Sequence, residues 1–107
     1  MNMTYSLREY TEDERPPFAD WFSGLDAVTA ARVDRSIRRM EAGNFGDSKA
    51  LKGGIHELRL AFGPGLRVYY GIDGKTLVIL LGGGDKRRQS ADISAAVKRW
   101  KRYTEGR

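Results

Sequence analysis

The chain has 107 residues, a length that suits one compact domain whose hydrophobic core can stand without disulfides or metals. It contains no cysteine, which excludes disulfides and thiolate metal sites and is consistent with a reducing compartment. The 19 lysines and arginines outnumber the 14 acidic residues, and this +5 balance favours a polyanionic partner. Because no apolar segment has the length of a signal sequence or a bilayer span, we expect a cytoplasmic protein with one domain over residues 1–107.

The charge is distributed unevenly along the chain. Residues 1–27 carry two basic and six acidic side chains, whereas residues 85–107 carry eight basic and three acidic ones. A basic C-terminal segment favours contact with nucleic-acid phosphates. The alternative is an ordinary solvated helix face, which is the more usual origin of such a run of charges when it is considered by itself.

The first half of the chain predicts one strand and two helices. Apolar and polar residues alternate over residues 3–8, from Met3, with the period of a half-buried strand. Pro16 and Pro17 open a helix with an apolar stripe formed by Phe18, Trp21, Phe22 and Leu25. Asp26 is positioned to cap a second helix, which ends at Gly43-Asn44. The inner face of this helix carries Val33, Ile37 and Met40, and its outer face carries Arg32, Arg35, Arg38 and Arg39.

The second half predicts a meander of strands and a final helix. After a loop that holds Asp47, Lys49 and Lys52, three apolar segments cover residues 55–62, 66–72 and 76–82. Gly63-Pro64-Gly65 suits a three-residue loop and Asp73-Gly74 suits a two-residue hairpin, while residues 89–103 have helical periodicity. We therefore expect an α+β fold with a mainly antiparallel four-stranded sheet, two N-terminal helices on one face and a C-terminal helix.

Strand register then predicts a cationic pocket. A three-residue loop at 63–65 pairs Leu58 with Tyr70 and places the apolar residues of both strands on one face of the sheet. The other face collects Glu57, Arg59, Arg67 and Tyr69, with Arg59 opposite Tyr69. A two-residue hairpin would bring Leu80 beside Arg67. The chain would then leave through Gly82-Gly83-Gly84, a flexible connection that permits close backbone approach and delivers Lys86 to the same place.

Four motifs occur in a specific order: Gly43-Asn44-Phe45-Gly46-Asp47, Glu57-Leu58-Arg59, Gly63-Pro64-Gly65-Leu66-Arg67-Val68-Tyr69-Tyr70 and Gly83-Gly84-Asp85-Lys86. In this order the chain resembles the RelE/ParE superfamily of small bacterial toxins, and within it the HigB-like branch that includes addiction-module killer proteins and phage-derived Gp49-like proteins. The resemblance covers nearly the whole chain and implies a small RelE-like fold.

The resemblance also implies an activity. RelE- and HigB-like toxins are ribosome-dependent mRNA endonucleases that cut the messenger in the ribosomal A site and so inhibit translation. They use no metal or other cofactor, because a 2′-hydroxyl of the RNA attacks the adjacent phosphate. The catalytic cations that the resemblance assigns here are Arg59, Arg67 and Lys86, with Arg67 as the phosphate clamp, and preorganised cations suit the charged phosphorane of this reaction.

Tyr69 and Glu57 complete the expected catalytic set. Tyr69 can bond or stack a base, but its ordinary pKa near 10 makes it a poor proton acceptor unless neighbouring cations lower that pKa. Glu57 has two readings, as a general base toward the 2′-hydroxyl or as a salt-bridge partner that orients Arg59. The single histidine, His56, alternates onto the apolar face and is interpreted as a packing residue. Tyr103 lies on a helix that is interpreted as a packing element, so the groups that move protons stay unassigned.

RNA-binding residues are expected around this pocket, namely Lys49, Lys52, Arg87, Arg88 and Gln89, with solvent-exposed charge as the alternative for each. The resemblance implies a cognate antitoxin, a helix-turn-helix protein like HigA, together with the ribosome and mRNA as partners. Two other functions stay open. One is poisoning of DNA gyrase, as in ParE-like toxins, which tend to lack this cationic set; the other is a non-catalytic RNA-binding module.

Overall fold

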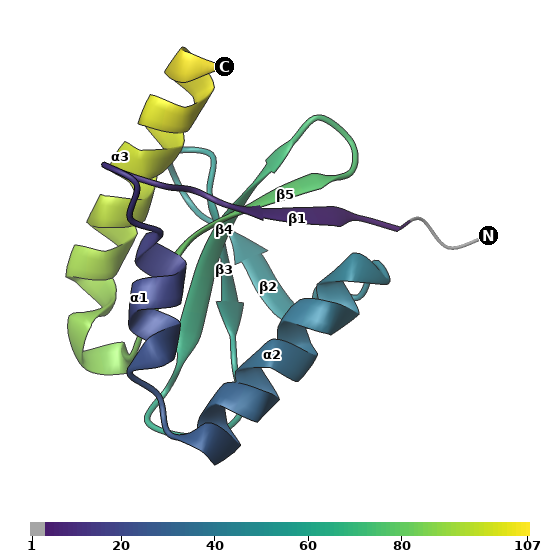
Figure 1. The fold of residues 1–107 in the computed structure, drawn as a ribbon, viewed down its shortest axis with the longest axis vertical. Helices are drawn as coiled ribbons and strands as arrows, with labels where there is room; N and C mark the ends of the chain where they lie inside the picture. Colours follow the sequence, from purple (N-terminus) through teal and green to yellow (C-terminus); the bar gives the residue numbers. More distant parts are fainter. Residues whose placement is uncertain (1–3) are drawn as a thin grey trace.

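Figure 1 shows the computed structural model, which describes residues 4–107. In chain order it contains β1 (Ser6–Glu9), α1 (Pro17–Ser23), α2 (Ala27–Glu41), β2 (Asp47–Ala50), β3 (His56–Arg59), β4 (Arg67–Asp73), β5 (Leu77–Gly84), the 3-10 helix η1 (Lys86–Arg88) and α3 (Gln89–Gly106). The predicted α+β class is confirmed. None of the helices in this part of the chain combines the length and the apolar character needed to cross a bilayer.

The strands form one mixed sheet. Its order is β1-β5-β4-β3-β2, with β1 parallel to β5 and the remaining neighbours antiparallel. Residues 4–107 thus hold five strands rather than the predicted four, because the expected loop at 47–50 pairs with β3. Asp-Ser-Lys-Ala lacks apolar alternation, yet an exposed edge strand needs none. Met3, predicted to start the first strand, lies outside the described residues.

The helices begin where local signals predicted, and α2 also ends there. Pro17 starts α1, and the Asp26 side chain caps α2 by accepting the Thr29 amide at 2.9 Å. This bond lowers the pKa of Asp26. Gly43, with φ of 87°, follows the end of α2, and α3 begins at Gln89 as expected. It continues to Gly106, because the sequence after Tyr103 carries no proline and only a terminal glycine.

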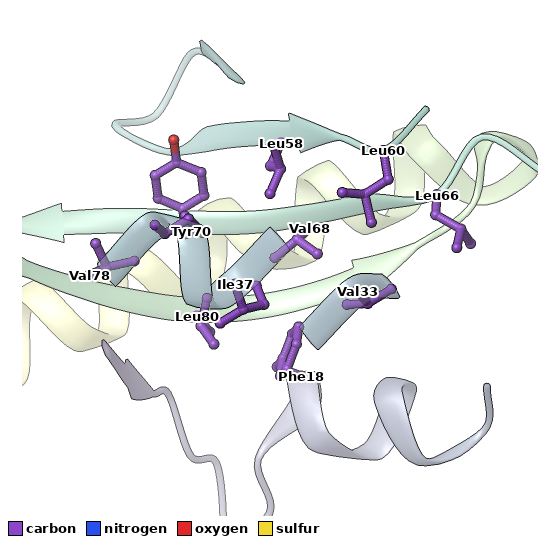
Figure 2. Close-up of a cluster of buried hydrophobic side chains, with 11 residues drawn as sticks. Phe18, Val33, Ile37, Leu58, Leu60, Leu66, Val68, Tyr70, Val78 and Leu80 are labelled. Carbon is purple, nitrogen blue, oxygen red and sulfur yellow. The ribbon is translucent and has the colours of Figure 1, made fainter. Parts of the chain in front are cut away.

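The helices cover both faces of the sheet. Helices α1 and α2 pack on one face. Figure 2 shows the buried side chains that meet there: Phe18, Val33, Ile37, Leu58, Leu60, Leu66, Val68, Tyr70, Val78 and Leu80. The opposite face packs against α3 through Ile55, Tyr69, Ile79, Leu81 and Ala96. Each fully buried aliphatic side chain contributes about 1.5–3 kcal/mol. The sheet therefore has two cores, and consecutive residues of β3 and β4 alternate between them.

Glycines let the helices approach the sheet closely. A methyl group added at Gly83 would collide with the Trp21 ring of α1, and one at Gly71 would collide with the Trp100 ring of α3. The expectation of close backbone approach at residues 82–84 is confirmed. Their assignment as a flexible connection was wrong, since all three residues pair with β4 as the end of β5.

The register between β3 and β4 differs from the prediction by two residues. Arg59 lies opposite Arg67, and Leu58 lies opposite Val68 rather than Tyr70. The connecting loop is longer than three residues, because Gly63 and Gly65 both take positive φ around Pro64 and Leu60 N–H donates to Leu66 C=O. A shift of two residues leaves every side chain on the same face of the sheet. The predicted assignment of β3 and β4 residues to the two faces is therefore correct despite the wrong register.

The register between β4 and β5 also differs. Asp73 pairs with Leu77, which leaves a three-residue turn in place of the predicted two-residue hairpin. A bulge then follows, since Tyr70 pairs with Leu80 whereas Tyr69 pairs with Gly82. Gly84, and not Leu80, consequently lies opposite Arg67. This shift brings the start of η1 directly beside the candidate site.

Candidate functional site

Three side chains of β3 and β4 form a polar cluster on the α3 face of the sheet. Glu57 is 0% exposed, Tyr69 1% and Arg67 8%. Glu57 lies opposite Tyr69, and Arg67 is two residues from Tyr69 along β4, so all three side chains point to the same face. The sequence predicted this grouping but not its burial. We call these three residues the buried polar cluster.

Arg67 is held from two directions. Its Nη1 donates to the Gly65 carbonyl at 2.6 Å, and its Nε lies 3.5 Å from Glu57 Oε2. The second contact is an ion pair without hydrogen-bond geometry, because Nε has no hydrogen-bond partner. The guanidinium is therefore fixed in place while one of its N–H groups stays unused. Nε is buried against Glu57, and a guanidinium held in this way is preorganised for phosphate, which guanidinium groups suit.

Glu57 is the acidic centre of the cluster. Gln89, at the start of α3, donates from Nε2 to Glu57 Oε2 at 2.9 Å, and Lys49 Nζ lies 4.0 Å from Oε1. Oε1 accepts no hydrogen bond. Of the two readings of Glu57, the partner of Arg59 is wrong, since the guanidinium beside Glu57 is that of Arg67. Gln89, expected to bind RNA, instead contacts a buried carboxylate.

Lys86 reaches the cluster through the backbone of the β3–β4 loop. Its N–H lies 3.4 Å from the Pro64 carbonyl. A methyl group built on Gly65 would lie 3.0 Å from Lys86 Cβ and 3.2 Å from Arg67 Nη1. Lys86 and Arg67 therefore meet at one glycine, while Lys86 itself remains exposed to solvent.

Arg59 does not join this group. Although it lies opposite Arg67 in register, its side chain is turned to the sheet edge, where Nε is 3.2 Å from Asp47 Oδ2. Asp47 lies opposite Arg59 because residues 47–50 form β2, which the sequence did not predict. The predicted pocket of three converging cations is therefore reduced to two, Arg67 and Lys86.

Tyr69 has an unusual hydroxyl. It is buried and forms no hydrogen bond of normal geometry. Burial, followed by the neighbouring Glu57 carboxylate, raises the pKa of Tyr69. Neighbouring cations would lower this pKa, and Arg67 acts in that direction, but burial and Glu57 outweigh it. The phenol therefore stays protonated at ordinary pH and offers a hydrogen-bond donor, not a base.

His56 and Tyr103 lie away from the cluster. The His56 ring stacks on Tyr70 at 5.2 Å on the α1/α2 face, which fits the predicted packing role, and burial lowers the pKa of His56. Tyr103 donates to Asp73 Oδ2 at 2.6 Å, at the opposite end of β4 from Arg67. Neither side chain is in a position to exchange protons with a group bound at Arg67.

The remaining predicted RNA-binding residues lie at different places. Arg87 and Arg88 are exposed in η1, next to Lys86, and Arg87 pairs with Asp85 at 3.5 Å. Lys49 is exposed on β2 and faces the cluster through Glu57. Lys52 is exposed in the turn between β2 and β3, at the opposite end of β3 from Arg59.

Asp92 is a site neighbour that the sequence analysis missed. A methyl group at Gly84, opposite Arg67, would collide with its carboxylate. Burial raises the pKa of Asp92, with Arg88 acting in the opposite direction, and Oδ2 has no hydrogen-bond partner. An acidic residue in the first turn of a helix after Gly83-Gly84 was the available signal, but it is typical of helix N-termini generally.

Comparison with known proteins identifies relatives of this chain in sequence and in fold. A solved structure of a mutant of the Escherichia coli toxin RelE in the free state has a TM-score of 0.68 and 22% identity, covering 91% of this chain and 98% of that one. A Haemophilus influenzae protein described as uncharacterized is 46% identical over 80 residues, which are 74% of this chain and 81% of that protein. The family model described as phage derived protein Gp49-like matches residues 20–103. The predicted RelE-like fold is confirmed, and the chain belongs to the Gp49-like family of phage-derived proteins.

Proposed function

We propose that this protein is the toxin of a type II toxin–antitoxin module and acts as a ribosome-dependent mRNA endonuclease. The observation that carries the proposal is the fixed Arg67 guanidinium, held by Glu57 and the Gly65 carbonyl, with Lys86 packed against the same glycine. A fixed guanidinium beside an exposed lysine that packs on the same glycine suits a single phosphate. The Gp49-like family and the RelE-like fold are consistent with this activity.

The reaction we assign is cleavage of RNA by its own 2′-hydroxyl. The O2′–P bond forms and the P–O5′ bond breaks, which leaves a 2′,3′-cyclic phosphate and a 5′-hydroxyl; the proton lost from O2′ is balanced by one gained at O5′. Arg67 and Lys86 neutralise the phosphorane oxygens, and the neutral, buried Tyr69 phenol lies on the same face of the sheet as Arg67. Charge stabilisation of this kind accounts for about 10²–10³ in rate per donor in well-studied sites.

Glu57 is assigned as the group that orients Arg67. Its carboxylate has no solvent exposure and contacts Arg67, Lys49 and Gln89, so a substrate hydroxyl cannot reach it in this conformation. Gln89 fixes the carboxylate from α3. A group that holds the phosphate clamp changes the rate without adding its own titration to the pH profile.

Exposed cations around the clamp are proposed to bind the RNA backbone. Arg87 and Arg88 continue from Lys86 along η1, and Lys49 lies on the other side of Glu57. Arg59 and Lys52 extend this surface along β3 and the turn before it. Contacts of this type add affinity that is independent of base sequence and falls with salt.

The partners we propose are the ribosome with its mRNA and a cognate antitoxin, a HigA-like helix-turn-helix protein, in the cytoplasm. The surface charge supports a polyanionic partner, since the net charge is +5. In this proposal, a single toxin domain that spans residues 1–107 binds both the ribosome with its mRNA and the antitoxin.

The test is a reconstituted translation reaction in which cleavage of the messenger is mapped by primer extension. We expect cleavage only with ribosomes, ends that carry a 2′,3′-cyclic phosphate, and a loss of about a hundredfold to a thousandfold in Arg67→Ala. Arg67→Lys keeps the positive charge but not the paired N–H donors of the guanidinium, so its cleavage rate should lie between those of the wild type and Arg67→Ala. Lys75→Ala, an exposed cation in the β4–β5 turn, is the control and should cleave normally.

Two results would overturn the proposal. Stabilised DNA breaks with purified gyrase, without messenger cleavage, would identify a gyrase poison. Binding to ribosomes or RNA without cleavage, by folded wild-type protein, would identify a non-catalytic module.

A further inference from the structure

A second surface beside the buried polar cluster has the chemistry of a nucleotide site. It is a groove of about 250 Å³ between α2 and the β3–β4 loop, and its walls include Arg39, Asn44, Phe45, Arg59, Leu60 and Phe62. The groove lies on the α1/α2 side of the sheet edge, whereas the cluster lies on the α3 side. We call it the α2 groove.

The groove carries uncompensated positive charge. Within residues 4–107, Arg32 and Arg39 of α2 form no ion pair, whereas Arg38 of the same helix is held by Asp34 and Glu41. Asp47 is the one carboxylate that lines the α2 groove among the described residues, and it pairs with Arg59 through Nε and Nη2. The Arg59 Nη1 group is left for a ligand. Two guanidiniums line the α2 groove against one carboxylate, and Arg32 adds a third cation beside it at Phe62, an arrangement that attracts an anion.

The groove also offers an aromatic surface. The Arg32 guanidinium lies over the Phe62 ring, 5.3 Å from its centroid, and Phe62 is only partly buried. A planar cation on a ring that solvent still reaches marks a face on which a planar base can stack. An acidic peptide would use the charge but would gain nothing from the ring, so the combination favours single-stranded RNA.

The groove is continuous with the cation pair at Gly65. Phe62 and Gly65 belong to the same loop, which the Leu60–Leu66 hydrogen bond closes, and Gly65 contacts Arg67 and Lys86. Arg59 and Arg67 are opposite each other in register, and the Arg59 side chain, turned to Asp47 at the sheet edge, lines the groove while Arg67 belongs to the cluster. A strand of RNA bound at Arg67 therefore needs only to cross this loop to enter the groove.

We propose that the α2 groove binds a nucleotide of single-stranded RNA that flanks the cleaved linkage. Arg39 and Arg59 contact its phosphate, and its base stacks against Phe62 and Arg32. The proposal rests on the proposed nuclease function for the position of the linkage, but the binding itself can be measured without cleavage.

The experiment uses the full chain and a fluorescein-labelled hexanucleotide RNA with 2′-O-methyl groups, which cannot be cleaved, with binding followed by fluorescence anisotropy at several salt concentrations. We expect the dissociation constant to rise about tenfold in Arg39→Glu, with a smaller salt slope, and about tenfold in Phe62→Ala. Lys75→Glu makes the same change in net charge at the distant β4–β5 turn and should change it less than about twofold. Asp47→Asn removes the opposing carboxylate and should tighten binding.

Circular dichroism and urea unfolding confirm that each variant is folded. Equal effects of Arg39→Glu and Lys75→Glu, or an unchanged affinity in Phe62→Ala, would overturn the groove. It would also be overturned if RNA affinity stayed constant while affinity for the antitoxin fell, because the occupant would then be a protein. Failure of the nuclease proposal is separate, since it appears as intact messenger with wild-type protein in the translation reaction.

Discussion

The two faces of the sheet have different compositions and different roles, as adjacent residues of the same strand show. Leu58 and Tyr70 enter the apolar core beneath α1 and α2, while their neighbours Glu57 and Tyr69 enter the α3 side. The first core contains only apolar and aromatic side chains (Figure 2), whereas the second places a carboxylate and a guanidinium among them. Burying an ion pair costs desolvation energy and seldom improves stability. The α1/α2 face therefore stabilises the fold, whereas the α3 face holds a cation in position at a cost in stability.

The largest effect expected from testing this comparison is on stability. Leu58→Ala removes a side chain that is 3% exposed and should lower the free energy of unfolding by about 3 kcal/mol, because buried apolar contacts beneath α2 are lost. Urea unfolding measures this loss. Messenger cleavage per folded molecule should stay near the wild-type rate, and a tenfold drop would mean that the two faces are not separable.

The neighbouring substitution Glu57→Gln should act mainly on activity. It keeps the shape of the side chain but removes the charge that holds Arg67, and we expect a loss of about thirtyfold in cleavage, or about 2 kcal/mol. The ribosome-dependent rate measured from pH 5 to 8 provides the test. An orienting role predicts a lower rate with an unchanged pH profile, whereas loss of an acidic limb would show that Glu57 is the general base.

A smaller effect is expected for the paired tyrosines of β4. Tyr69→Phe removes a buried hydroxyl without a regular partner, so the free energy of unfolding should change by less than about 1 kcal/mol while cleavage falls up to about tenfold. Tyr70→Phe, one residue away on the other face, is the matched control. Similar cleavage by both variants would remove Tyr69 from the proposed site.

The smallest effect concerns His56 and pH. Burial lowers its pKa in the folded protein below the ordinary value of 6.5, so the unfolded chain binds the proton first. The contribution of neutral, buried His56 to the free energy of unfolding is therefore complete at a pH above 6.5 and is lost as the pH falls below that value. His56→Phe should keep the stack on Tyr70 and show a weaker fall in unfolding free energy between pH 7 and pH 5. An identical pH dependence in both proteins would exclude His56 as its source.

The sequence by itself determined every α-helix and every strand except the edge strand β2, and it determined the face of the sheet on which the residues of β3 and β4 lie. Helix caps at Asp26, the apolar stripe of α2 and the alternation along β3 and β4 are local signals, and each was confirmed. The grouping of Glu57, Arg67 and Tyr69 followed from alternation alone, because strand period does not depend on exact register.

Tertiary structure decided which charges meet. A two-residue register shift and the unpredicted β2 strand paired Arg59 with Asp47, and Gln89 reached Glu57 from 32 positions away in the chain. Neither contact has a sequence signal, because loop length, a bulge and helix docking set the positions of side chains that are distant in sequence. Periodicity reports the face on which a side chain lies, but the partner it finds there depends on how the separate elements pack.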